Sequence, residues 1–259
     1  MKKLGIVTPD PWAELGRFTQ ARIGLGRCGS SLPLSKSLEF RMAWAKAKDA
    51  VLQPLDRKRL AGELNECGLP TCLLASTATD RKQYLMRPDH GRRLDRNSQE
   101  QLNNFDRNYD LCLVICDGLS SPAVQNHSLR VLCGFAEKAM IAELSCSPVF
   151  IVKNGRVAIG DEIGEGVGAK MTILLVGERP GLTSPDSLGA YLTWAPAIVT
   201  TDEARNCISN IRSGGLARED AIRKLCYLVE ESFRLKRSGV GLKDRMGKNY
   251  LPFAGMLTG

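Results

Sequence analysis

Long apolar runs are missing from this 259-residue chain, since none approaches the roughly 18–20 residues that span a bilayer. The N-terminus reaches Pro9, Asp10 and Pro11 before the apolar core of a secretion signal can form. Hydrophobic residues make up 43% of the chain and charged residues 25%, which is typical of a globular protein. We therefore expect a soluble, cytoplasmic protein without a membrane partner.

Histidine is scarce, with only His90 and His127 in the sequence. Neither lies in a metal-binding spacing such as H-x-x-x-H or H-E-x-x-H. A triad of Ser120, His127 and Asp117 has little support, because no G-x-S-x-G motif surrounds the serine. We expect His127 on the surface, and the sequence predicts neither a metal site nor a self-contained catalytic set.

Paired cysteine motifs are also missing. The nine cysteines include no C-x-x-C pair, which argues against a zinc ribbon and a disulfide framework. Cys112 and Cys116 lie four residues apart in the apolar run DLCLVICDG, so both are expected on one face of a strand as small buried hydrophobes. The pattern indicates a reducing compartment.

Positive charge is in excess, with 36 Lys and Arg against 28 Asp and Glu and a net charge of +8. This balance favours anionic partners such as nucleic acid, a phosphorylated cofactor or an acidic protein surface, and it also fits an ordinary basic surface. Aromatic residues make up 6% of the chain and are not interleaved with a basic stripe, which argues against nucleic acid.

The first part of the chain has a helical pattern. We predict helix within residues 8–27 and 38–53, where Leu38 and Met42 fall near helical spacing. The sequence thus predicts a small helical N-terminal subdomain at residues 1–62.

From residue 63 to 259 the pattern is that of an α/β domain. Short, continuously apolar runs indicate parallel strands buried on both faces. They lie at residues 70–77, 110–118, 147–155 and 171–181. Helical patterns separate or follow them at residues 92–105, 122–144, 161–166 and 217–238. Right-handed crossovers then predict an open, doubly wound, Rossmann-like and mostly parallel sheet, and the Gly-rich tail is expected to be loosely ordered.

A formal G-x-G-x-x-G motif spans residues 24–29. A dinucleotide fingerprint needs a buried strand before it and a helix after it, whereas TQARI is short and polar and Pro33 interrupts the following segment. A flexible glycine loop is the stronger interpretation, and a stand-alone oxidoreductase is the weaker one.

The carboxyl ends of the predicted strands indicate a ligand crevice. Glu178 directly follows an apolar strand and can accept hydrogen bonds from a ligand, or form an ion pair with Arg179 or Arg156. Val157 follows the predicted strand at residues 147–155. Cys207 is expected near the start of a short helix, where its side chain either faces a ligand or packs inside the protein. With no acid, base, nucleophile or metal set in the pattern, a cofactor or partner would supply the chemistry.

Several blocks of the sequence resemble the ethanolamine ammonia-lyase small (light) subunit, over roughly residues 19–240. The blocks, in family order, are ARIGLGRCGS, LEFRMAWAKAKDAV, YLMRPDHGRRLD, VICDGLSSPAV, VKNGRVAIGDEIGE, GAKMTILLVGERPGL and NCISNIRSGG. The segment before Thr19 and the tail after Leu242 differ from the family pattern.

The resemblance implies a subunit of an adenosylcobalamin-dependent ammonia-lyase, which converts ethanolamine to acetaldehyde and ammonia by a radical mechanism. The large subunit would bind ethanolamine and carry out the radical chemistry, while this chain would complete the cobalamin site at their interface. Localisation in a bacterial microcompartment is also implied. The base-off motif D-x-H-x-x-G is missing, so the cofactor is expected to keep its own dimethylbenzimidazole.

Family cobalamin contacts correspond to Val157 in GRVAI, Glu178 in GERPG and Cys207 in CISNI. The resemblance implies that Val157 packs on the corrin edge, Glu178 accepts hydrogen bonds from amides, and Cys207 fills space against the macrocycle. The alternative is that the chain is a basic α/β domain with a nucleic-acid-binding or regulatory function.

Overall fold

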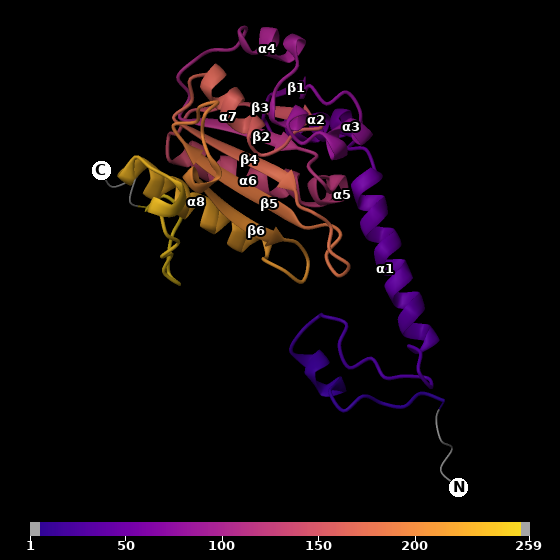
Figure 1. Cartoon of the computed structure of the whole chain (residues 1–259). Coiled ribbons are helices and arrows are strands. Elements are labelled where there is room, and N and C mark those ends of the chain that lie inside the picture. Colours follow the sequence, from indigo (N-terminus) through magenta and orange to yellow (C-terminus); the bar gives the residue numbers. More distant parts are fainter. Residues whose placement is uncertain (1–5, 255–259) are drawn as a thin grey trace.

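A six-stranded sheet organises the part of the chain that the computed structural model describes, residues 6–254 (Figure 1). The strands are β1 (Thr71–Ala75), β2 (Leu111–Cys116), β3 (Cys146–Lys153), β4 (Met171–Gly177), β5 (Leu188–Trp194) and β6 (Arg205–Ile211). Their order in the sheet is β1-β3-β2-β4-β5-β6. The four apolar runs predicted as strands are therefore confirmed, and they lie side by side.

The sheet is mixed. Strands β1, β3, β2 and β4 run parallel, whereas β5 is antiparallel to β4 and β6 is antiparallel to β5. Residues 178–187 and 195–204, the connections after β4 and β5, are shorter than the dozen or more residues that a parallel crossover needs. The α/β class is confirmed, and the doubly wound, Rossmann-like arrangement is not, because the chain returns by hairpins at this edge.

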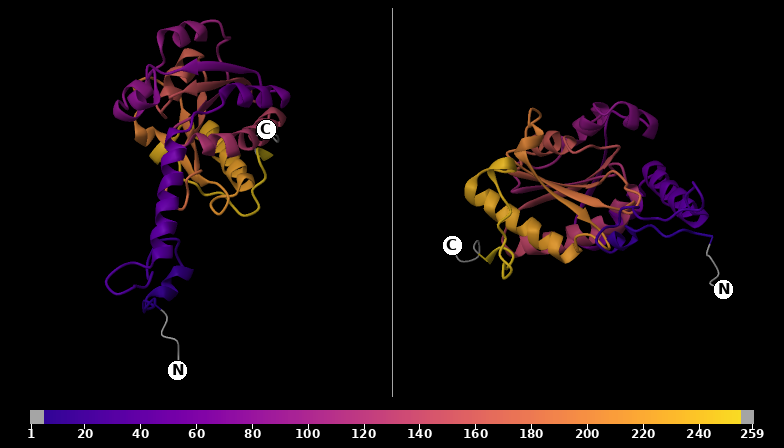
Figure 2. Two further views of the ribbon diagram at one scale, coloured as in Figure 1. Left: turned by 90° about the vertical axis from the view of Figure 1, so that its right-hand side faces the viewer. Right: turned by 60° about the horizontal axis from the view of Figure 1, so that its bottom comes forward.

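Helices cover both faces of the parallel part of the sheet (Figure 2). One layer contains α2 (Arg57–Glu66), α6 (Leu129–Ile141) and α8 (Arg218–Leu235), and the other contains α4 (Arg96–Leu102) and α7 (Ile159–Gly166). The shorter elements are α3 (Arg81–Met86), α5 (Ser121–Ala123), a π-helical turn at Val124–Ser128, and 3₁₀ turns at Ala13–Arg17, His90–Arg92, Asp202–Ala204 and Gly239–Gly241. Among the described residues, no helix has both the length and the apolar character needed to cross a bilayer.

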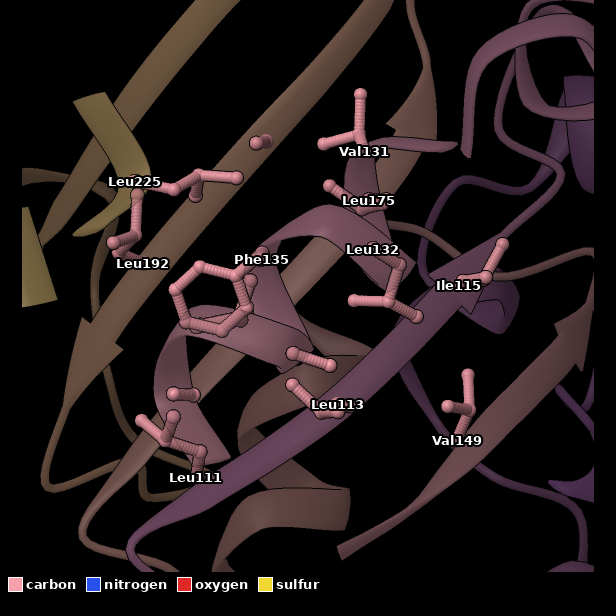
Figure 3. Packing of buried hydrophobic residues seen from close by; sticks show 14 of the residues in the cluster. Leu111, Leu113, Ile115, Val131, Leu132, Phe135, Val149, Leu175, Leu192 and Leu225 are labelled. Atoms are coloured by element: carbon pink, nitrogen blue, oxygen red, sulfur yellow. The ribbon is translucent and has the colours of Figure 1, made fainter. Parts of the chain in front are cut away.

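Strand β2 is buried on both faces, so its side chains enter two cores. Leu113 and Ile115 pack in the larger core with Leu132 and Phe135 of α6 (Figure 3). Cys112 and Cys116, on the opposite face, belong to the smaller core beneath α7, as their spacing predicted. Burial raises the pKa of the Cys112 thiol to about 12, so this group is an unreactive hydrophobe.

An N-terminal arm, residues 6–52, projects from this body (Figures 1 and 2). Its helix α1 (Leu34–Leu52) confirms the second predicted helix, but Leu38 and Met42 on that helix are 53% and 61% exposed. The helix predicted over residues 8–27 is wrong, because this segment contains only the 3₁₀ turn at Ala13–Arg17.

Glycine and proline explain the irregular segment. Pro9 and Pro11 disfavour helix for the residues before them. Gly24 and Gly26 take positive φ angles of 60° and 74°, at which an L side chain would also clash with the backbone of Ala13 or Thr8. The G-x-G-x-x-G motif thus lies in the arm, away from the strands of the sheet, and forms a glycine loop.

The C-terminal segment folds back on the body as far as residue 254. Phe253 is fully buried and packs edge-on against Phe135, with 6.3 Å between ring centroids, and Leu242 is also buried. The expectation of a loosely ordered tail is therefore wrong at Leu242 and Phe253, whereas residues 243–249 between them are mostly exposed and form no regular helix or strand. Its last five residues, 255–259, lie outside the described part.

Candidate functional site

Two adjoining cavities lie just beyond the carboxyl ends of β3 and β4. The first, of about 420 Å³, is lined by Tyr84, Val157 and Glu178 among others. The second, of about 750 Å³, lies between Val157, Tyr191 and Cys207. Arg156, Val157 and Tyr191 line both cavities, so we treat the two as one groove. The three residues singled out from the sequence, Val157, Glu178 and Cys207, all line it.

Val157 lies in the loop between β3 and α7, and the buried Asp117 holds this loop. The Asp117 carboxylate accepts hydrogen bonds from the backbone N–H groups of Asn154 at 3.0 Å and Gly155 at 3.2 Å. Burial raises the pKa of Asp117, while these donors and Arg81 act in the opposite direction. A Cβ on Gly155 would lie 2.5 Å from the sulfur of Cys116, so the loop needs glycine to pack on β2. Asp117 therefore positions the wall of the groove.

Two arginines stack on Tyr84 at the end of the first cavity. The guanidinium carbons of Arg81 and Arg156 lie 4.7 and 4.4 Å from the Tyr84 ring centroid. Arg156 donates from Nη2 to the carbonyl of Tyr84 at 2.9 Å, and its buried Nε has no hydrogen-bond partner. Tyr84 was missed in the sequence because RKQYLM contains no signal beyond a short helical pattern.

The Glu178 carboxylate joins the end of β4 to β5 and β6. It accepts hydrogen bonds from Ser187 Oγ and Ser209 Oγ, both at 2.5 Å, and from the backbone N–H of Asn210 at 3.2 Å. No ion pair links Glu178 to a basic residue within residues 6–254. A carboxylate has about four acceptor positions, so roughly one is left for a ligand. The two serines were missed because their contact with Glu178 depends on the antiparallel return of the chain.

Cys207 lies within strand β6, and its expected position at a helix start is wrong. Ile208 points into the larger core, whereas Cys207 and Ser209 are exposed on the opposite face. The next buried residue, Ile211, lies three positions further on because the register of the ladder shifts there, so the sequence contained no clean strand alternation. Cys207 pairs across the ladder with Tyr191, which is also a groove residue.

Tyr191 and Cys207 form the floor of the groove, and their phenol and thiol groups are neutral. Desolvation raises the pKa of both the Tyr191 phenol and the Cys207 thiol, and the nearby Glu178 charge acts in the same direction. A thiol with a raised pKa is a poor nucleophile at neutral pH. Among the described residues no cluster of His, Cys, Asp and Glu has the geometry to hold a metal ion.

His127 is buried, so its expected place on the surface is wrong. Its Nδ1 accepts a hydrogen bond from Arg218 Nε at 3.3 Å, and its Nε2 lies 3.3 Å from Asp186 Oδ2. Because Nδ1 accepts, the neutral ring carries its proton on Nε2 and donates it to Asp186. The histidine thus fixes the loop between Glu178 and Ser187 to helix α8.

We expect His127→Ala to lower the free energy of unfolding by about 1–3 kcal/mol, since Arg218 and Asp186 lose a buried partner. Urea denaturation followed by tryptophan fluorescence measures the change. The control, His90→Ala, removes a half-buried ring 3.7 Å from Asp89 and is expected to cost about 0.5–1 kcal/mol. Equal losses in the two variants would contradict the role of His127.

Comparison with known proteins agrees with the resemblance of the sequence blocks. The chain matches the ethanolamine ammonia-lyase light chain family over residues 9–243. It is 48% identical to an ethanolamine ammonia-lyase small subunit of Pseudomonas fluorescens over 248 residues, which cover 94% of this chain and 90% of the relative. It is 49% identical to small subunits of Pseudomonas aeruginosa, covering 91% and 88%, and of Pseudomonas putida, covering 92% and 89%. The chain therefore belongs to the ethanolamine ammonia-lyase small (light) subunit family.

Proposed function

We propose that the groove holds one side of adenosylcobalamin at the interface with a large subunit, and that the assembled enzyme converts ethanolamine to acetaldehyde and ammonia. The observation that carries this proposal is the convergence of Val157, Glu178 and Cys207 on one groove from three different parts of the sheet. These are the positions that match the cobalamin contacts of the family.

The groove fits such a ligand in size and in chemistry. A corrin is a broad, flat ring with amide side chains at its edge, and it needs an open surface with dispersed polar groups. Tyr191 and Val157 offer apolar contact where the two cavities join. The buried Arg156 Nε is a donor without a partner, and Glu178 retains one acceptor position.

Each groove residue then has a defined task. Val157 packs on the corrin edge, and Glu178 accepts a hydrogen bond from an amide side chain. Cys207 fills space on the floor as a neutral thiol, beside the Tyr191 ring. Neither histidine lines the groove, and His127 is already engaged by Arg218 and Asp186, which supports retention of the cofactor's own dimethylbenzimidazole.

When bound, adenosylcobalamin supplies a carbon-centred radical through homolytic cleavage of its cobalt–carbon bond. The residues of this chain hold and shield the cofactor, while the large subunit binds ethanolamine. This division of work is consistent with the neutral phenol of Tyr191, the neutral thiol of Cys207 and the nearly saturated carboxylate of Glu178.

Ammonia release tests the proposal. The large subunit is assayed with ethanolamine and adenosylcobalamin, with and without this chain. Activity that depends on both chains is the expected result. A well-formed complex of the two chains that releases no ammonia would refute the proposed reaction.

Glu178→Ala is expected to weaken cobalamin binding by the assembled enzyme about 5- to 150-fold, because one buried hydrogen bond is worth about 1–3 kcal/mol. Equilibrium dialysis of adenosylcobalamin against the complex measures this affinity. Ser209→Ala is the matched control, since it loosens β6 from Glu178 but keeps the carboxylate. A similar loss in both variants would mean that Glu178 acts only by joining the strands.

A further inference from the structure

The N-terminal arm exposes an unusual amount of apolar surface. Residues 6–52 contain thirteen of the twenty-three large hydrophobic side chains that are exposed in the described part of the chain. On α1, Leu34, Leu38 and Met42 recur every four residues on one face, and Phe40 and Trp44 lie on the opposite face. A helix that is apolar on opposite sides is normally buried.

The arm has little support from its own chain. Ala50 is the only buried residue of α1, and the contacts to the body are near its C-terminal end, where Arg81 Nε donates to the carbonyl of Val51 at 2.6 Å. The remaining length of the helix extends away from the body (Figures 1 and 2). Most helical stability in proteins comes from tertiary packing, and the described part of this chain supplies little of it to α1.

We propose that the arm is a docking surface for the large subunit, continuous with the groove. The inference rests on the proposed function in so far as the groove faces that subunit. Its first support is position. A cavity of about 700 Å³ is lined by Leu25, Leu32 and Phe40 of the arm and by Leu182 and Thr183 of the loop that begins at Glu178. A partner that closes the groove over Glu178 therefore meets the arm directly beyond that loop.

Charge supports the same occupant over a second copy of this chain. Residues 6–52 contain seven Lys and Arg and four Asp and Glu, and the whole chain carries +8. Docking of the arms of two copies would bring like charges together. A partner with an apolar surface and an acidic rim would instead complement the arm. Lys48 and Arg22 lie over the rings of Trp44 and Phe40, so the basic groups border the apolar contacts.

The test uses the double variant Leu38→Glu/Met42→Glu. Both side chains are exposed, so the free chain is expected to keep its far-ultraviolet circular dichroism and urea midpoint. The matched control is Met140→Glu/Ile141→Glu, a pair at the end of α6 that is 67% and 59% exposed. Isothermal titration calorimetry with the large subunit is done without adenosylcobalamin, so the result does not depend on the cofactor site.

We expect the arm variant to bind the large subunit at least about 100-fold more weakly, because two central apolar contacts become charged, and the control to change less than about 3-fold. Wild-type affinity in the arm variant would overturn the proposal. A free chain that sediments as a dimer, which the arm variant abolishes, would also overturn it. So would arm-dependent binding to phosphatidylglycerol vesicles, if binding to the large subunit is unchanged in the variant. Arm-dependent assembly without ammonia release would refute the proposed reaction and leave the docking surface in place.

Discussion

Gly177→Ala is expected to destabilise the protein by more than about 3 kcal/mol, or to prevent its folding. A Cβ at position 177 would lie 2.0 Å from the carbonyl oxygen of Ser120 and 2.7 Å from that of Asp117. Both atoms belong to the backbone, so no side-chain rotation can relieve the clash. The same close approach lets the N–H of Leu119 donate to the carbonyl of Gly177 at 2.8 Å. The end of β4, which Glu178 directly follows, thus depends on this glycine.

Gly62→Ala provides the control for this substitution. Gly62 lies in α2 with open space around its Cβ position, so alanine is expected to stabilise the helix by about 0.5–1 kcal/mol. Soluble yield and urea midpoints compare the two variants. A Gly177→Ala protein within about 1 kcal/mol of the wild type would show that the β2–α5 loop can move away, and would refute the close-packing explanation.

Asp161→Ala is expected to cost about 3–5 kcal/mol in free energy of unfolding. Asp161 on α7 and Arg205 at the start of β6 form an ion pair in which both side chains are only 3% exposed. Removing the carboxylate leaves a buried guanidinium that retains the Thr200 carbonyl and the exposed Asp202 as partners. Because Arg205 begins β6, we expect the loss to loosen the floor of the groove as well.

Two further variants separate the effect of burying an ion pair on stability from the effect of losing any ion pair. Glu100→Ala breaks a pair with Arg96 whose side chains are 64% and 91% exposed, and is expected to cost at most about 0.5 kcal/mol. Asp161→Leu/Arg205→Met replaces both charges by apolar groups and is expected to recover most of the stability. Chemical denaturation of the three variants gives the comparison. An Asp161→Ala loss no larger than that of Glu100→Ala would contradict the explanation.

Much of the parallel sheet could be predicted because its strands are buried on both faces, which leaves continuous apolar runs in the sequence. The antiparallel edge could not, since β6 does not alternate polar and apolar residues: its buried side chains, Ile208 and Ile211, are three residues apart, a spacing that also fits a helix. The direction of β5 depends on the short length of the connection from β4, which becomes decisive only once both strands are known. The division at residue 62 stays a prediction, as does a microcompartment location.

The candidate site was predictable to the level of positions. Glu178 and Val157 follow apolar strands, and Cys207 was indicated by the resemblance to the family. The contacts that hold these residues join distant parts of the chain. Arg218 is 91 residues from His127, and Ser209 is 31 residues from Glu178. Local patterns carry no information on such pairs, which explains why a buried histidine was expected on the surface.

The antiparallel edge also affects how the groove can be varied. In a parallel sheet, a ligand meets loops at the strand ends, and reshaping the site means changing loop length or conformation. Here part of the floor consists of mid-strand side chains, Tyr191 and Cys207, on a backbone held by ladder hydrogen bonds. Floor depth can therefore be changed in small steps, for example by Cys207→Ala, which removes the sulfur, or Cys207→Val, which puts two methyl groups in its place, while the walls set by Asp117 and Gly177 stay in place. This makes β6 the natural strand on which to vary the size of the ligand that the groove accepts, which under the proposed function is a corrinoid.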